Sequence, residues 1–289
     1  MPPSAGGLLA RCRFPPPGEE LDCGVSGGAD SLALLILAVA AGCRVTAIHV
    51  DHGLRPGSEA EAEVVRRAAE GLGAAFRAVS VEVGGGPNVE ARARRARLSA
   101  LPPDAATGHT ADDQAETVVL NLLRGAGLDG LAGMRPGRRH PILALRRAET
   151  VALCADAGLR PVDDPSNRDL SLRRNRVRHQ VMPLLAQVGG RDVAAVVARQ
   201  AALLADDADL LDSLASAIDP TVVADLAAAP APLARRALRR WLRDDEGHPP
   251  SSAAVERVMG VVRHESTSAE IGGGRSVHRR AGRLRLERD

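Results

Sequence analysis

The sequence predicts an α/β protein, in which a parallel sheet with helices on both faces forms the first domain and a smaller, mainly helical domain follows. Its length of 289 residues suits two domains of about 150 residues each. Strand-like and helix-like segments alternate through the first half, and from residue 191 the chain becomes rich in Ala and Leu. We therefore expect one domain over residues 1–190 and a second over residues 191–289.

The strands of the first domain are expected where short apolar or β-branched runs end at glycine or polar residues, and the helices where apolar residues recur at helical spacing. This alternation implies parallel strands joined by helices. In such a sheet ligands bind beyond the carboxyl ends of the strands, so the residues after each strand are candidates for a site. The expected strands are 21–25, 45–51, 76–83 and 105–109, and the expected helices are 31–41, 59–73, 88–101 and 111–125.

The second domain is divided by prolines into segments with helical patterns, and its tail alternates as a hairpin or strand does. The net charge of the whole chain is only +2, which gives no overall attraction to nucleic acid. Positive charge is local instead, in an arginine cluster at 168–178 and in the tail. The expected helices are 192–217, 221–229, 231–245 and 251–264, and the tail is 276–289.

The chain contains no lysine, so all 38 basic residues are arginines. Codon bias in a GC-rich genome is the simplest explanation. The absence excludes any mechanism that needs a P-loop lysine, a Schiff base or a kinase-type lysine. Tyrosine is absent too, and the aromatic residues are Phe14, Phe76 and Trp241. Any stacking on nucleic-acid bases therefore has to rely on arginine planes.

The four cysteines are widely spaced and form no CxxC pair, which argues against a disulfide framework, a zinc site or an iron–sulfur site. The longest apolar run, 32–41, is half of the roughly 20 residues that a bilayer requires. The first residues lack the charged segment and apolar stretch of a secretory signal. We expect a cytoplasmic protein with no membrane partner.

The strongest motif is VSGGADS, directly after an expected strand and before an expected helix. Its two glycines allow backbone conformations closed to other residues, and the N–H groups of such a loop and helix start bind anions. Its serines add hydroxyl donors, and its aspartate is placed to hold Mg²⁺ on a polyphosphate. The motif has neither the Walker lysine nor the GxGxxG spacing, and an ordinary glycine-rich turn with a serine cap is the alternative. The expected site comprises Ser26, Gly27, Gly28, Ala29, Asp30 and Ser31.

The block TGHTADDQAET, at residues 107–117, places polar groups after the fourth expected strand. His109 ends the strand, and Asp112, Asp113 and Glu116 fall in the first turns of the next helix. Carboxylates here could bind an ammonium group, or one could act as a general base. Acids at a helix start also stabilise the helix dipole, which is the simpler alternative.

Three other blocks carry groups suited to nucleotide or phosphate contact. In the first, His49 and Asp51 end the second expected strand. In the second, Arg94 and Arg97 share one face of a helix, and the third is arginine-rich and includes Arg174. For each block, a solvated strand end or helix face is the alternative. The blocks are HVDHGLR (49–55), NVEARARRARLSAL (88–101) and DPSNRDLSLRRNRVR (164–178).

The motif at 26–31 resembles the PP-loop of the ATP-pyrophosphatase superfamily, and the blocks taken in order over residues 20–185 resemble the compact form of the tRNA(Ile)-lysidine synthase family. TGHTADDQAET and DPSNRD…RNRVR are the family-specific parts. The resemblance implies a Rossmann-like PP-loop domain that uses ATP to adenylate the C2 carbonyl oxygen of the wobble cytidine in a CAU anticodon. Free lysine then attacks C2 and AMP leaves. The sequence departs from the family at His140, where the family has an arginine.

The resemblance also implies partners and residue roles. The partners are tRNA(Ile) with a CAU anticodon and free L-lysine; the cofactors are ATP and Mg²⁺; and a homodimer is left open. The second domain is expected to grip the tRNA through its tail arginines, with a purely stabilising domain as the alternative. The implied ATP site is 26–31 with His49 and Asp51, and Asp30 holds the metal. The implied catalytic residues are His109, Asp112, Asp113 and Glu116, and the implied phosphate contacts are Arg94, Arg97 and Arg174.

Other functions remain open from the sequence. A PP-loop tRNA thiolase is the first alternative, but its chemistry needs paired cysteines, and the CxxC is absent. Another tRNA-adenylating enzyme, or a synthetase that amidates a small molecule, would share the loop; the latter normally brings an ammonia route. A catalytically silent binding module is disfavoured because the loop and the acidic helix start are both complete.

Overall fold

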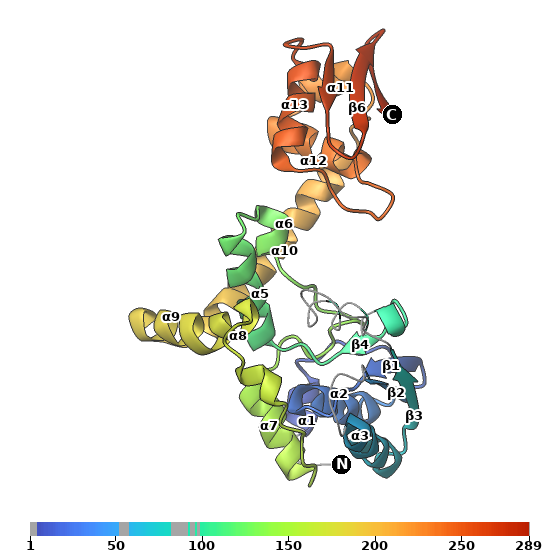
Figure 1. The fold of residues 1–289 in the computed structure, drawn as a ribbon, viewed down its shortest axis with the longest axis vertical. Coiled ribbons are helices and arrows are strands. Elements are labelled where there is room, and N and C mark those ends of the chain that lie inside the picture. Colours follow the sequence, from blue (N-terminus) through green and yellow to red (C-terminus); the bar gives the residue numbers. More distant parts are fainter. Residues whose placement is uncertain (1–4, 52–57, 82–91, 93–95, 97–98, 289) are drawn as a thin grey trace. The chain divides into compact units, whose positions relative to one another are not determined.

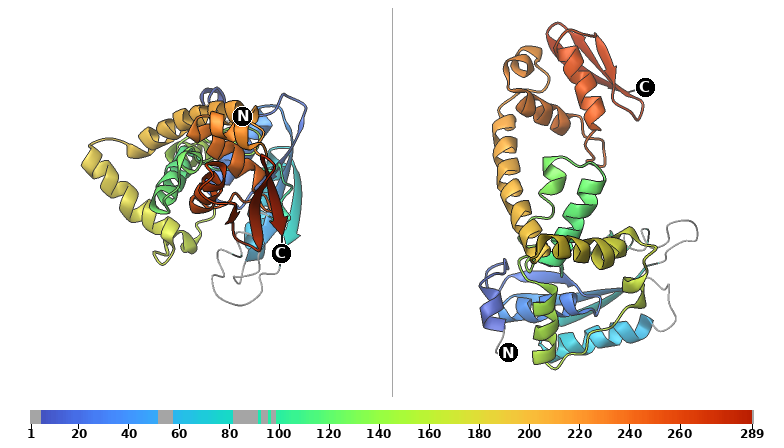
Figure 2. Two further views of the ribbon diagram at one scale, coloured as in Figure 1. Left: turned by 90° about the horizontal axis from the view of Figure 1, so that it is seen from above. Right: turned by 90° about the vertical axis from the view of Figure 1, so that its left-hand side faces the viewer.

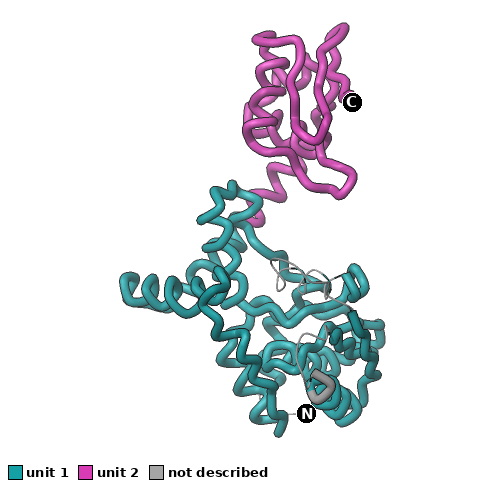
Figure 3. The backbone as a smooth tube through the Cα atoms, in the orientation of Figure 1, with its two compact units in different colours: residues 1–204 teal, residues 205–289 magenta. Residues whose placement is uncertain are grey.

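The computed structural model describes residues 5–51, 58–81, 92, 96 and 99–288 (Figure 1). The chain divides into two compact units, residues 1–204 and 205–289 (Figure 3). This division falls inside helix α10 (Val193–Ser216). The domain boundary expected at residues 190 and 191 stays a prediction.

The first unit is built on a four-stranded parallel sheet, whose strands lie in the order β3-β2-β1-β4. Cys23 of the first strand pairs with Ala47 on one side and with Ala106 on the other. The α/β fold expected from the alternating pattern is thereby confirmed, although the fourth strand is shorter than expected. The strands are β1 (Glu20–Gly24), β2 (Arg44–Asp51), β3 (Ala75–Ser80) and β4 (Ala106–Thr107).

Helices α2 (Ala29–Ala40), α3 (Ser58–Gly71) and α7 (Arg147–Asp156) lie along one face of this sheet (Figure 2). Each of the first two connects neighbouring parallel strands, and α7 packs beside α2. The helix expected over 88–101 lies largely outside the described residues: 92, 96, 99 and 100 are placed in helix, and residue 101 is in a bend. The unit also contains α1 (Ala5–Leu9), α5 (Ala111–Leu123) and α6 (Leu128–Leu131).

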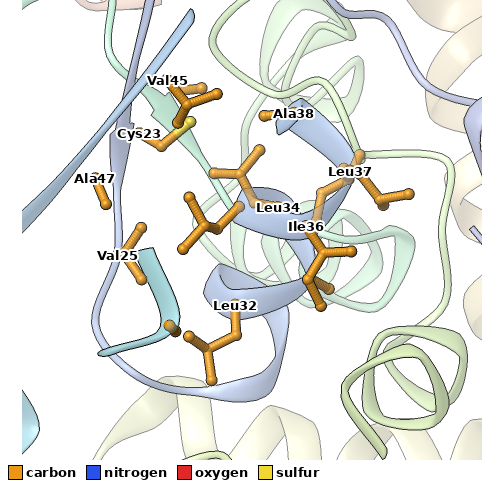
Figure 4. Packing of buried hydrophobic residues seen from close by; sticks show 14 of the residues in the cluster. Cys23, Val25, Leu32, Leu34, Ile36, Leu37, Ala38, Val45 and Ala47 are labelled. Carbon is orange, nitrogen blue, oxygen red and sulfur yellow. The ribbon is translucent and has the colours of Figure 1, made fainter. Parts of the chain in front are cut away.

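The core of this unit forms between α2 and the sheet. Every residue of α2 from Leu32 to Ala38 is at most 1% exposed, because the helix is covered by the sheet on one side and by α7 on another. Figure 4 shows Leu34 and Ile36 of this helix together with Cys23 and Val45 of the strands. Truncating a leucine to alanine in a core of this kind costs about 2–5 kcal/mol, so the helix start that follows β1 is held firmly in place.

The arginine-rich block forms a series of short turns before the long helix α10. A π-helical turn, Val177–Val181, directly follows α8. Among the described residues no single helix is long and apolar enough to cross a membrane; the bent pair Arg173–Gly189 and Val193–Ser216 satisfies length and composition only when counted together. The segments are a 3-10 turn (Pro165–Arg168), α8 (Arg173–Arg176) and α9 (Met182–Gly189).

The second unit packs three helices with a small antiparallel sheet of order β5-β6-β7. The hairpin expected in the tail is confirmed, whereas β5 was not expected. Helix α12 ends at Trp241, before the end expected at residue 245, and the chain then forms a separate turn in which the Asp244 carboxylate accepts a hydrogen bond from the His248 N–H at 2.7 Å. The elements are α11 (Val223–Ala228), α12 (Ala231–Trp241), α13 (Ser252–Val262), β5 (Ser268–Glu270), β6 (Arg275–Arg280) and β7 (Arg283–Arg288).

Candidate active site

The strand order changes direction between β1 and β4, and open parallel sheets bind ligands at such a point. The chain first runs from β1 through β2 to β3, and then returns to the other side of β1. The loops that follow β1 and β4 therefore meet. A Cβ on Gly108 would lie 2.6 Å from the backbone oxygen of Asp30, so the two loops are in direct backbone contact.

The loop after β1 folds into an anion-binding turn. Gly27 has φ +87°, a conformation that favours glycine, and its carbonyl accepts a hydrogen bond from the Val162 N–H at 3.0 Å. The Ser31 hydroxyl donates to the Gly28 carbonyl at 2.9 Å and accepts from the Ser26 N–H at 3.1 Å. These bonds fix the backbone around the first turn of α2, where N–H groups and the positive end of the helix dipole favour phosphate.

Asp30 points from this turn toward helix α7. One carboxylate oxygen accepts a hydrogen bond from the Thr150 hydroxyl, and the other accepts from Arg147 Nε at 3.2 Å. Burial raises the pKa of Asp30, while the bonds from Thr150 and Arg147 act in the opposite direction. Asp30 is therefore a carboxylate whose charge depends on the guanidinium beside it.

Asp113 and Glu116 project from the start of α5. Asp113 accepts hydrogen bonds from the N–H and hydroxyl of Thr110, at 2.9 and 2.8 Å, which closes a capping box. Burial opposes ionisation of Asp113, but Arg147 and Arg174 outweigh it and hold its pKa at about 2. Glu116 is 2% exposed and has guanidinium groups at both oxygens. A buried glutamate with such partners is held in one orientation.

Asp112 turns toward a different arginine. Its two oxygens accept hydrogen bonds from Arg146 at 2.8 and 3.0 Å, and the N–H of Arg147 adds a third at 2.8 Å. Burial opposes the ionised form, but these donors outweigh it and lower the pKa of Asp112. Arg146 also pairs with Asp192. The Asp112 carboxylate therefore links α5 to the start of α7, and its hydrogen bonds are not directed at the loop after β1.

Arg174, from the arginine-rich block, is a second arginine that contacts both Asp113 and Glu116. Its Nε donates to Glu116 at 2.9 Å, and its Nη2 donates to Asp113 at 3.1 Å. Arg178, one turn further on, lies 3.8 Å from Glu116. Arg174 was predicted to contact phosphate; in this structure it pairs with carboxylates.

His109 and His140 meet at the end of β4, with their ring centroids 5.0 Å apart. The Thr107 hydroxyl lies 2.7 Å from Nδ1 of His109 and 3.0 Å from Nδ1 of His140. A hydroxyl donates one proton, so at least one imidazole donates through Nδ1. Burial lowers the pKa of His140, with Arg139 adding to the effect. His140 is therefore a neutral partner of His109 near pH 7.

The structure thus brings together four of the expected features: the 26–31 turn, which includes Asp30, and the side chains of Asp113, Glu116 and Arg174. His49 lies behind the turn, 3% exposed, with Nδ1 2.9 Å from the Val25 carbonyl. Asp51 is at the end of β2, two strands from β4. Arg94 and Arg97 lie outside the described residues, so their expected roles stay predictions.

Two of the central residues were not expected from the sequence. Arg147 and Thr150 fall in a segment, RRAET, that carries no strand pattern and no family-specific motif. The available signal was Glu149, an acid of the kind enriched in the first turn of a helix, which here accepts a hydrogen bond from the Arg146 N–H at 2.7 Å. Nothing in that signal reveals that the helix packs beside α2 and delivers an arginine to the loop after β1.

Asp30 fits Mg²⁺ only in part. A carboxylate oxygen is a donor that Mg²⁺ accepts, and one carboxylate with phosphate oxygens is a usual ligand set. Both oxygens of Asp30 already accept hydrogen bonds, however. Within the part of the chain that the structure describes, no group of three His, Cys, Asp or Glu residues is placed to hold a metal ion. Any metal would therefore arrive with the polyphosphate and share Asp30.

Comparison with known proteins agrees with this geometry. A family model described as a PP-loop domain matches residues 10–185, and a model described as the TilS substrate binding domain matches residues 222–285. Among solved structures, the U34-tRNA thiolase NcsA from Methanococcus maripaludis superimposes with a TM-score of 0.53, over 70% of this chain and 78% of that chain. At 16% identity this similarity shows a shared fold.

The sequence relatives are more specific. The tRNA(Ile)-lysidine synthase of Nocardia farcinica is 41% identical over 287 residues, which cover 91% of this chain and 90% of the relative. The tRNA(Ile)-lysidine synthase of Mycolicibacterium paratuberculosis is 47% identical over 234 residues, which cover 75% and 72%. The chain therefore belongs to the tRNA(Ile)-lysidine synthase family of ATP-using PP-loop enzymes that modify tRNA.

Proposed function

We propose that this protein joins lysine to C2 of the wobble cytidine in tRNA(Ile) with a CAU anticodon, forming lysidine. ATP adenylates the C2 carbonyl oxygen and releases pyrophosphate, and the lysine ε-amine then displaces AMP. The observation that carries the proposal is that one sheet edge joins an anion-binding turn to an acidic helix start, with Arg147 in contact with both Asp30 and Asp113. The reaction needs both groups within reach of one cytidine.

The turn at 26–31 is proposed to hold the ATP phosphates through its N–H groups and the serine hydroxyls, with His49 and Asp51 supporting the nucleotide from β2. Mg²⁺ would share Asp30 with the phosphates. When bound, the ion would neutralise charge on the leaving pyrophosphate. His49 supports this assignment through its bond to the Val25 carbonyl, which steadies the strand end that carries the turn.

Asp113 and Glu116 are proposed to bind the ammonium groups of lysine. Support comes from their present partners, which are cations: two guanidinium groups already occupy this position. Before attack the ε-ammonium must lose a proton, and a nearby carboxylate or His109 is the proposed acceptor. Asp112, which bonds to Arg146, would position α5 and stand outside direct contact.

Contact with tRNA is proposed for both units. In the first, an apolar groove of about 330 Å³ has Leu120 and Leu123 in its wall and Arg124, Arg173 and Arg176 around it. Arginines beside an apolar surface suit an RNA strand, whose phosphates need positive charge and whose bases stack. In the second, the arginines of the β6–β7 hairpin are the proposed phosphate contacts. We further propose a cytoplasmic location and a homodimer; sedimentation of the purified protein tests the latter.

The cysteines disfavour the thiolase alternative. Cys23, Cys43 and Cys154 are buried, and Cys12 is half-buried. Burial raises the pKa of Cys12 and of Cys154 to about 11, so neither thiol ionises readily near neutral pH. Sulfur transfer uses thiolates.

Mass spectrometry of tRNA(Ile) after incubation with ATP and L-lysine tests the proposal. We expect the anticodon fragment to gain one lysine less one water. A control reaction uses a transcript with U in place of the wobble cytidine and gives no gain. A sulfur-for-oxygen gain, or an unchanged mass with active protein, contradicts the proposal.

A further inference from the structure

Arg147 contacts both parts of the site, the 26–31 turn and the acidic start of α5. It is the first residue of α7, and its guanidinium contacts carboxylates from two other elements. The Nε atom donates to Asp30 at 3.2 Å, Nη2 donates to Asp113 at 2.9 Å, and Nη1 donates to Glu116 at 3.2 Å. The side chain is 20% exposed, so these bonds form in a region largely shielded from water.

Arg174 and Arg147 differ in the carboxylates that they contact. Both contact Asp113 and Glu116, whereas Arg147 also contacts Asp30 in the phosphate-binding turn. Thr150 holds the other oxygen of Asp30, so the carboxylate stays directed at α7. A single guanidinium therefore links the proposed ATP site to the proposed lysine site.

Both proposed ligands compete for this guanidinium or for its partners. A lysine ammonium placed on Asp113 and Glu116 needs the carboxylate oxygens that Arg147 now occupies. A polyphosphate at the turn adds negative charge beside Asp30 and attracts the same guanidinium. Phosphates at the turn draw Arg147 away from α5, which frees the carboxylates for lysine. Lysine on those carboxylates displaces Arg147, which can then turn toward the phosphates. Both ligands therefore favour the same position of Arg147.

We infer that Arg147 is a positioning residue through which ATP and lysine strengthen each other's binding. This inference rests on the proposed function, since it assumes that these two ligands occupy the site. Because linkage between two ligands is reciprocal, each must raise the affinity for the other by the same factor. We expect a factor of at least about five, the lower end of typical coupling between sites.

Calorimetric titration of the full-length protein with L-lysine, with and without saturating α,β-methylene-ATP at constant Mg²⁺, measures the factor. The wild type should bind lysine at least about fivefold more tightly with the analogue present. Arg147→Gln should reduce the ratio to one. Arg147→Lys, which keeps the charge but not the three-way contact, should give an intermediate ratio. The matched control is Arg146→Gln: that arginine is adjacent but bonds to Asp112 and Asp192, so the ratio should persist.

Thermal melting and binding of the analogue alone establish that each variant is folded. If Arg147→Gln does not fold, Thr150→Val and Arg147→Lys are compared instead. Thr150→Val removes a bond to Asp30 but leaves Arg147 in place, so it should retain the ratio of lysine affinities. Arg147→Lys should lower that ratio. Equal lysine affinities in the wild type, or a ratio retained by Arg147→Gln, overturn the inference. If lysidine forms but ATP and lysine do not affect each other's binding, only the inference is contradicted. If no lysidine forms, the proposed function is contradicted.

Discussion

The pKa values of two aspartates of the site are shifted in opposite directions by their surroundings. Burial raises the pKa of Asp30, whereas for Asp113 the charges of Arg147 and Arg174 outweigh burial and hold the pKa at about 2. Asp113 is therefore ionised throughout the physiological range, and it is the carboxylate suited to a permanent cationic partner. The pKa of Asp30 is raised, so a cation bound beside it would favour its ionised form.

The lowered pKa of Asp113 makes its contribution to stability depend on pH. Its folded pKa lies below the unfolded value of 3.8, so the contribution is complete above about pH 4 and is lost as the pH falls to about 2. The difference corresponds to about 2 kcal/mol. In chemical denaturation, Asp113→Asn should be less stable than the wild type by that amount at pH 7 and should converge with it near pH 2.

The exposed Asp207 of α10 provides the control for this comparison. Asp207→Asn should follow the wild type within about 0.5 kcal/mol at every pH, as surface substitutions usually do. A gap between Asp113→Asn and the wild type that stays constant from pH 7 to pH 2 would show that charge is not its origin.

Asp30 is expected to matter for chemistry more than for stability. Its burial disfavours the charge, so Asp30→Asn should melt within a few degrees of the wild type. Exchange of labelled pyrophosphate into ATP on a CAU-anticodon transcript should fall at least about 100-fold, the usual cost of losing a preorganised polar group at a reacting phosphate. Undiminished exchange would remove Asp30 from the ATP site.

At the scale of the elements, the turn after β1 and the acidic start of α5 were predictable from the sequence because both depend on local patterns. Glycines and serines after a strand, and carboxylates in the first turn of a helix, are visible in the chain itself. The choice of partners is not local: Asp113 could pair with any of 38 arginines. Arg147 reaches it only because α7 packs beside α2, a contact between segments more than a hundred residues apart. Arg174 was found, but its carboxylate partners were not expected, for the same reason.

The backbone contact between the two loops predicts that Gly108 tolerates no side chain. Its φ is not in the left-handed region, so the constraint is space: a Cβ would lie 2.6 Å from the Asp30 backbone oxygen and 2.8 Å from the Ser31 nitrogen. Backbone atoms cannot move aside as a side chain can. Gly108→Ala should cost about 1–3 kcal/mol in denaturant unfolding and should also slow pyrophosphate exchange.

Gly71, at the end of α3, is the matched control because nothing lies within 4 Å of its added Cβ. Gly71→Ala should leave stability unchanged or raise it by up to about 1 kcal/mol. If both alanine variants behave alike, the close approach of the two loops is not a constraint on the protein.

At the scale of the molecule, charge is distributed in the way the composition suggested. The net charge is small, and arginines gather locally, many of them paired with acids of their own unit. The second unit was predicted from the change to an Ala- and Leu-rich composition, and its terminal hairpin from alternation in the tail. The extra strand β5 did not, because three residues between polar turns carry too short a pattern to detect.

The arginines of the β6–β7 hairpin should contribute to the salt dependence of tRNA affinity. Arg280 and Arg285 are exposed on β6 and β7. Each phosphate contact releases counterions, so Arg280→Gln with Arg285→Gln should reduce the slope of log affinity against log salt by about 2. Affinity for ATP should not change. Arg235→Gln, which removes an arginine paired with Glu256, is the control, and an equal loss of slope there would refute a specific role for the hairpin.

The guanidinium groups on Asp113 and Glu116 have a consequence for substrate choice. A pocket that already accommodates arginine side chains cannot reject free arginine by charge. In the proposed reaction, selection of lysine therefore has to come from side-chain length and from the flatness of the guanidinium, which cannot present a lone pair to C2 as an amine does. Small guanidinium compounds that imitate Arg147 without offering a nucleophile are accordingly natural starting points for competitive inhibitors.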